Sequence, residues 1–193
     1  MNPSSTIYSG ALSLFLSCAA LAQSSFQLRN YSSINGVDAA VFDAQGVPLA
    51  GPNYLAELWG AATPDSLTPL LEISRGSRRE IVPFGAGGYF FSDVAFLSVP
   101  TVAPYGWAWL ELRAWDARLG ATYEEVAALG IGGYGESPLF YAQGGNPLDL
   151  LSPVPAPLIG LQSFSLREIV PEPGSIVLLG LGLLVMVGCQ RRR

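Results

Sequence analysis

Trp107-Ala-Trp-Leu-Glu-Leu-Arg-Ala-Trp-Asp116 is the stretch that decides the fold, because its side chains alternate in character with a period of two. The even-numbered side chains from 108 to 114 are all alanine or leucine, which suit a hydrophobic core. The opposite face carries three tryptophans, an acid and an arginine, namely Trp107, Trp109, Glu111, Arg113 and Trp115. The pattern therefore predicts a β-strand over residues 107–116 whose aliphatic face is buried.

The aromatic face of this strand has two interpretations. In the first it is a carbohydrate-binding strip, where Trp107, Trp109 and Trp115 stack on sugar rings while Glu111 and Arg113 bind hydroxyl groups. In the second the tryptophans pack against a neighbouring strand, loop or sheet, and Arg113 lies over an indole ring. We favour packing over sugar binding.

Short strands separated by Gly and Pro are predicted along the rest of the body. Asp43-Ala-Gln-Gly46 is typical of a hairpin turn, because glycine accepts the positive φ that such turns need. The fold class expected is all-β, an antiparallel β-sandwich of jelly-roll or immunoglobulin-like type, with a closed barrel as the alternative. The other predicted strands cover residues 26–30, 38–43, 54–59, 70–73, 89–91, 96–102, 139–143 and 162–170.

One short helix is expected within this β-rich body. Thr122-Tyr-Glu-Glu125 has the spacing of a capping box, so a helix should follow from Tyr123 to Leu129 and end at Gly130. Gly130, Gly132 and Gly135 also satisfy the glycine pattern of dinucleotide-binding loops. That pattern requires a strand before it and a helix after it, and here the order is reversed, so we do not expect nucleotide binding.

The composition removes most catalytic schemes. The chain has no histidine, all ten basic residues are arginine, and the two cysteines, Cys18 and Cys189, lie in the terminal apolar segments. The body therefore has no imidazole base, no amine for a Schiff base and no nitrogen or sulfur ligand for zinc. All fifteen acids and seven of the arginines lie between Gln23 and Glu172, a net charge of −8 that disfavours nucleic acid. We expect no enzymatic activity, no cofactor and no metal site, and glycoside hydrolysis by two carboxylates is the one enzyme class left open.

The N-terminus is expected to be a signal peptide over residues 1–22. An apolar run from Ala11 ends at Ala20-Leu-Ala22, whose small residues fit signal peptidase cleavage before Gln23. The segment before the apolar run lacks the usual Arg or Lys. A lipoprotein anchored at Cys18 is the less favoured alternative.

The C-terminus has three parts in a fixed order. Val170-Pro171-Glu172-Pro173 is rigid and cannot continue a helix. An uncharged apolar stretch comes next, and the chain closes with Arg191, Arg192 and Arg193. The 18 uncharged residues from Pro173 to Gln190 would span about 27 Å as a helix, so we expect a transmembrane helix over about residues 174–190. The arginines should stay cytoplasmic and place the body outside the cell membrane.

These last 24 residues resemble the PEP-CTERM protein-sorting signal, which combines a Val-Pro-Glu-Pro motif, a short apolar span and terminal arginines. The resemblance implies that an exosortase, a membrane protease-transpeptidase, reads the signal while the protein is delivered to the cell surface or extracellular matrix. Val170, Pro171, Glu172 and Pro173 would then be the recognition element, and the arginines would stop transfer.

The sequence as a whole predicts an exported surface protein. Residues 23–169 would form its β-sandwich domain, with a structural or adhesive role and extracellular polysaccharide as a possible partner. The first alternative is a carbohydrate-binding module that uses the aromatic face of residues 107–115, and a small glycan-active hydrolase is the lower alternative.

Overall fold

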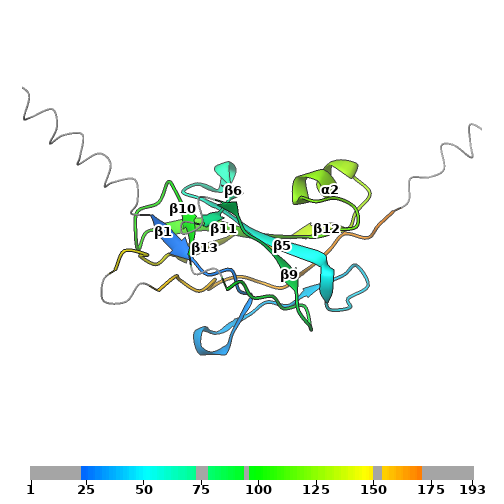
Figure 1. The fold of residues 1–193 in the computed structure, drawn as a ribbon, viewed down its shortest axis with the longest axis horizontal. Coiled ribbons are helices and arrows are strands. Elements are labelled where there is room, and N and C mark those ends of the chain that lie inside the picture. The colour runs from blue at the N-terminus through cyan, green and yellow to red at the C-terminus, as the bar shows by residue number, and fades with distance from the viewer. Residues whose placement is uncertain (1–22, 73–77, 94–95, 150–153, 171–193) are drawn as a thin grey trace, which may run out of the picture.

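The computed structural model describes residues 23–72, 78–93, 96–149 and 154–170. Within these ranges the chain forms mostly antiparallel β-strands and one α-helix, as predicted (Figure 1). None of the helices in the described ranges is long and apolar enough to cross a membrane. The predicted signal peptide, the predicted span over about residues 174–190 and the terminal arginines lie outside the described residues.

The centre of the fold is a six-stranded sheet built on two long strands. β5 (Gly51–Ala61) and β11 (Trp107–Asp116) pair antiparallel, with Trp109 opposite Ala61 and Asp116 opposite Tyr54. The strand predicted from the alternation of residues 107–116 is confirmed at both ends. The remaining strands flank this pair: β6 (Thr68–Pro69) and β9 (Ile81–Phe84) beside β5, and β12 (Tyr134–Glu136) and β13 (Phe140–Gln143) beside β11.

A four-stranded sheet and two small strand pairs complete the β-structure of the described residues. The four-stranded sheet has the order β1 (Ser24–Phe26), β10 (Leu97–Val99), β7 (Leu71–Glu72) and β8 (Arg78–Arg79). The small pairs are antiparallel β2 (Tyr31–Ser32) with β3 (Val37–Asp38) and parallel β4 (Val41–Phe42) with β14 (Phe164–Ser165). Two single-turn 3-10 helices, Ser33–Asn35 and Pro64–Ser66, lie in the connections.

The main hydrophobic core draws side chains from both larger sheets. Phe26 and Leu97 from the four-stranded sheet belong to the same buried cluster as Leu58, Leu110 and Leu112 from the central sheet. The aliphatic face of β11 is completely buried, as its alternation predicts. Each buried leucine contributes about 1.5–3 kcal/mol relative to exposure, so this cluster is the main source of stability.

The other face of the central sheet is covered at one end by the helix α2 (Tyr123–Leu129). Its predicted capping box is present: the Glu125 N–H donates to the Thr122 hydroxyl oxygen, and the Glu125 carboxylate accepts from the Thr122 N–H. Gly130 ends the helix with φ at 69°. Tyr123 and Val126 pack on Trp115 and form a second, smaller core.

Several predicted local elements differ from those observed. The Asp43–Gly46 turn is confirmed, since Gly46 has φ of 80° and its N–H donates to the Asp43 carbonyl. The predicted strand over residues 89–91 is wrong, because this segment makes only an isolated bridge between Phe91 and Arg29. The strand predicted over residues 162–170 is only Phe164–Ser165, and the strand predicted over 26–30 overlaps β1 only at Phe26.

Candidate functional site

An exposed aromatic cluster lies at the end of the central sheet that α2 does not cover. It consists of Trp107 and Trp109 on β11 and Tyr141 on the neighbouring strand β13. The register places Tyr141 opposite Trp109. Its ring centroid is 5.2 Å from Trp107 with an interplanar angle of 24°, and 4.9 Å from Trp109. Trp107 is 51% exposed and Tyr141 is 49% exposed, so the cluster presents flat ring surface to solvent.

Trp115 lies on the same face of β11 but in a different environment. Its side chain is fully buried beneath α2, and its ring packs edge-on against Tyr123 at 6.5 Å. Its indole N–H has no hydrogen-bond partner among the described residues. Trp115 is therefore inaccessible to a ligand in this structure. Of the three tryptophans of the predicted strip, Trp107 is exposed and Trp109 is partly buried.

The two charged residues of the predicted strip, Glu111 and Arg113, form an ion pair, and Arg113 also stacks on an aromatic ring. Arg113 Nε lies 2.5 Å from Glu111 Oε1, and both side chains are mostly buried. The guanidinium lies 3.7 Å from the ring centroid of Trp59 on β5. The stacking of Arg113 on an indole is thus as the packing interpretation expects, although the indole belongs to β5 and not to β11. Trp59 lies opposite Glu111 in the β5–β11 register, which the sequence alone does not give.

A buried ion pair holds α2 against this face. The Glu57 carboxylate is completely buried; it accepts hydrogen bonds of 2.5 Å from Arg79 Nε and Nη2, and one of 2.9 Å from Trp59 Nε1. Arg79 also binds Glu124 of α2 at 3.0 Å. Hydrogen bonding to Glu57 raises the pKa of Arg79 above its ordinary value. Burial alone would raise the pKa of Glu124, but hydrogen bonds from Arg79 and the backbone outweigh burial and lower it. Arg79 and Glu124 are therefore both charged at neutral pH.

Residues 164–170, the exit segment, connect the body to the predicted sorting motif. Their backbone is hydrogen-bonded to the loop after α2 and to the start of β12: Arg167 N–H donates to Tyr134 O, Gly133 N–H to Arg167 O, and Val170 N–H to Ile131 O at 2.7 Å. Hydrogen bonding thus continues to the residue before Pro171.

Glycines make this close approach of two backbones possible. A Cβ on Gly132 would lie 1.9 Å from the Glu168 carbonyl oxygen, and one on Gly135 would lie 2.7 Å from that of Ser165. Any side chain at these positions would push the exit segment away. Of the three glycines that satisfy the pattern of dinucleotide-binding loops, Gly132 and Gly135 therefore have a packing role, and Gly130 ends α2.

Comparison with known proteins identifies the C-terminal segment to which the exit segment leads. Residues 170–193 match the family model of the PEP-CTERM protein-sorting motif. The chain carries a PEP-CTERM sorting motif. Such a motif implies an exported protein that is targeted to the cell surface and processed by an exosortase. No curated protein and no solved structure matches the chain.

The PEP-CTERM motif begins at the last residue of the exit segment. Val170 is exposed and bonded to Ile131, while Pro171, Glu172, Pro173 and the terminal arginines lie outside the described residues, as do Ala20 and Ala22. The sorting motif and the aromatic cluster are therefore separate features of the chain: one begins beside the loop after α2, and the other occupies the uncovered end of the central sheet.

Proposed function

We propose that this chain is an exported cell-surface or extracellular-matrix protein whose body has a structural or adhesive role and is not an enzyme. The observation that carries the proposal is the PEP-CTERM match at residues 170–193, joined directly to a folded β-rich body at Val170. On this proposal signal peptidase removes residues 1–22, the apolar stretch spans the membrane with the arginines inside, and exosortase then processes the tail.

Two further observations support a non-catalytic body. The chain lacks histidine and lysine, and the buried acid Glu57 is occupied by Arg79 and Trp59, so it cannot contact a substrate.

A single buried cluster receives side chains from both larger sheets, which supports a β-sandwich as the architecture. A sandwich of this kind suits a packing or binding role at a surface.

Replacing Pro171, Glu172 and Pro173 together with alanine should block tail processing. We expect the wild-type protein to have a mature N-terminus at Gln23 and to lose its terminal arginines, whereas the variant keeps Arg193 and stays in the membrane fraction. Cell fractionation with mass spectrometry of both mature ends measures this. Glu168→Ala removes a nearby exposed acid outside the motif and should be processed normally. Normal processing of the triple variant would contradict the proposal.

Carbohydrate binding by the aromatic cluster is a second candidate function. The observation that favours it is the pair of half-exposed, nearly parallel rings of Trp107 and Tyr141. Flat aromatic surface of this kind can stack on the apolar face of a sugar ring.

Trp107→Ala should weaken binding on a glycan array by about 2- to 12-fold, because one stacked ring is worth about 0.5–1.5 kcal/mol. Trp107 is half exposed, so the variant should remain folded. Trp115→Ala provides the contrast: it should lower the free energy of unfolding by about 3–5 kcal/mol, because it removes a fully buried ring. An intact protein that binds no glycan, or that binds equally well without Trp107, would exclude this second function.

A further inference from the structure

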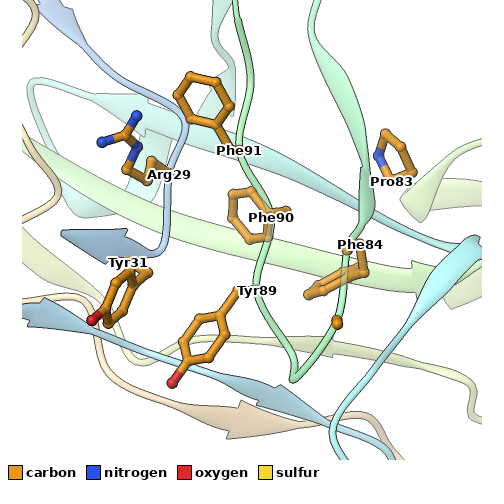
Figure 2. A pocket seen from close by; sticks show the side chains of 9 residues that line it. Arg29, Tyr31, Pro83, Phe84, Tyr89, Phe90 and Phe91 are labelled. Atoms are coloured by element: carbon orange, nitrogen blue, oxygen red, sulfur yellow. The ribbon is translucent and has the colours of Figure 1, made fainter.

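A depression lined by aromatic rings lies apart from the aromatic cluster of β11 and β13. It has a volume of about 560 Å³, and its walls come from residues 29–31 and 83–91. Figure 2 shows Tyr31 and Tyr89 side by side, Phe90 between Tyr89 and Phe91 in the view, and Arg29 beside Phe91. Tyr31 is 48% exposed and Phe91 is 54% exposed, so much of the ring surface is open to solvent. A volume of this size can hold one or two sugar residues.

The two walls are fixed to each other by a buried asparagine. Asn30 is completely buried; its Nδ2 donates to the carbonyl oxygens of Ala39 and Gly88 at 2.8 and 2.9 Å, and its Oδ1 accepts from Phe90 N–H at 2.9 Å. The Tyr89 hydroxyl donates to Asp38 Oδ1 at 2.7 Å, which holds its ring in place. The depression is therefore preformed, which lowers the entropic cost of binding a ligand.

Arg29 supplies a positive charge at the rim of the depression. Its guanidinium carbon lies 4.3 Å from the Phe91 ring centroid, and no carboxylate among the described residues pairs with it. Other arginines of the body do have acidic partners: Arg79 with Glu57, Arg113 with Glu111, Arg118 with Asp116 and Arg167 with Glu136. A half-buried guanidinium stacked on a ring keeps its remaining donors free for a carboxylate, which it can bind through two parallel hydrogen bonds.

We propose that this depression binds a carboxylate-bearing sugar, such as a uronic acid residue of an acidic polysaccharide. The apolar face of the sugar ring stacks on Tyr31, the Tyr89 ring lies against the edge of the sugar, and the sugar carboxylate binds Arg29. The two tyrosine rings are 5.2 Å apart and tilted by 58°. Stacking alone would accept a neutral sugar, and a lone arginine would accept any anion, so the combination selects the acidic sugar. The proposal does not depend on the aromatic cluster or on how the tail is processed.

Binding of oligogalacturonate to the full-length chain in detergent micelles tests the proposal. We expect measurable affinity by calorimetry, and a loss of roughly ten- to hundredfold for Arg29→Gln, because hydrogen bonds to charged groups are among the stronger ones. Tyr31→Ala should also weaken binding. Arg78→Gln is the matched control, since Arg78 is an exposed arginine of β8 that does not line the depression, and its loss changes the net charge equally. Circular dichroism of each variant should match the wild type.

Two changes of ligand test the chemistry separately. Methyl esterification removes the carboxylate charge of oligogalacturonate. The methyl ester should therefore bind the wild-type protein as weakly as the free acid binds the Arg29→Gln variant. Polyglutamate, which has carboxylates but no sugar ring, should not compete. The proposal would be overturned if the methyl ester bound the wild type as tightly as the free acid does, or if polyglutamate competed with oligogalacturonate. It would also be overturned if Arg29→Gln and Arg78→Gln lost the same affinity. The protein body is acidic, so a polyanion has no general attraction to it that could imitate the expected result.

Discussion

Replacing Arg79 with methionine is expected to lower the free energy of unfolding by about 3–5 kcal/mol. Glu57 has no solvent-exposed side-chain surface, and Arg79 donates two of the hydrogen bonds that its carboxylate accepts. The substitution leaves this negative charge buried with only Trp59 as a donor. It also removes the link from the sheet to Glu124 on α2. Chemical denaturation monitored by tryptophan fluorescence measures the loss.

Two further variants show whether the buried charge is the cause. Arg78→Met removes the neighbouring exposed arginine and should change stability by no more than about 0.5 kcal/mol. The double variant Arg79→Met/Glu57→Gln removes the charge but keeps an acceptor for Trp59, so it should recover more than half of the loss. A double variant as unstable as Arg79→Met alone would show that lost packing, and not the stranded carboxylate, is responsible.

Gly132→Ala is expected to destabilise the protein by about 3–5 kcal/mol, a sum of backbone strain and lost hydrogen bonds. The new Cβ would lie 1.9 Å from the Glu168 carbonyl oxygen, so the exit segment must move away. Gly132 also has φ of 95°, a conformation that costs an L-residue about 1–2 kcal/mol. Backbone hydrogen bonds between the exit segment and residues 131–134 would be lost, at about 0.5–1.5 kcal/mol each.

Hydrogen exchange at the Val170 and Gly133 amides should locate this effect, because both amides become exposed when the exit segment detaches. Gly130→Ala is the matched control. Gly130 has a similar positive φ of 69°, but a Cβ there would meet no atom within 4 Å. It should cost about 1–2 kcal/mol from backbone strain alone. Equal losses for the two variants would mean that the close approach to Glu168 contributes nothing.

The elements that can be predicted well from the sequence are those set by local chemistry. The alternation from Trp107 to Asp116 fixes which side chains of β11 face the core, and the structure buries those side chains. The capping box at Thr122 and the glycine at 130 fix both ends of α2. Such signals depend on neighbouring residues alone, so no knowledge of the rest of the fold is needed.

The parts that cannot be predicted in this way depend on which strands become neighbours. Trp59 and Tyr141 join the face of β11 through the register of β5 and β13, which alternation does not specify. Trp115 shares a face with Trp107, yet only the placement of α2 makes one buried and the other exposed. The sequence therefore predicts the aromatic face but not its division into a covered and an open part.

Aromatic content is also misleading for the strand predicted at residues 89–91. These side chains favour β-structure, but hydrogen bonds from Phe90 N–H to Asn30 Oδ1 and from the Tyr89 hydroxyl to Asp38 hold the segment as a wall of the depression. β12 is not predicted from the sequence, because Gly132, Gly133 and Gly135 in and beside it are typical of a loop and not of a strand. Here the glycines allow a neighbouring backbone to approach closely.

The seam between the exit segment and the loop after α2 also determines how the molecule would respond to tension. If the C-terminal segment anchors the protein, as proposed, tension would enter the described part of the fold at Val170, whose N–H donates to Ile131 O. The hydrogen bonds of this seam would break in order from that end. The Val170–Ile131 bond would break first, then the bonds of Arg167, and last the bond from Leu166 N–H to Phe42 O. A pulled molecule would thus lengthen by a few residues while its central sheet stays closed, and the seam would act as a short extensible tether.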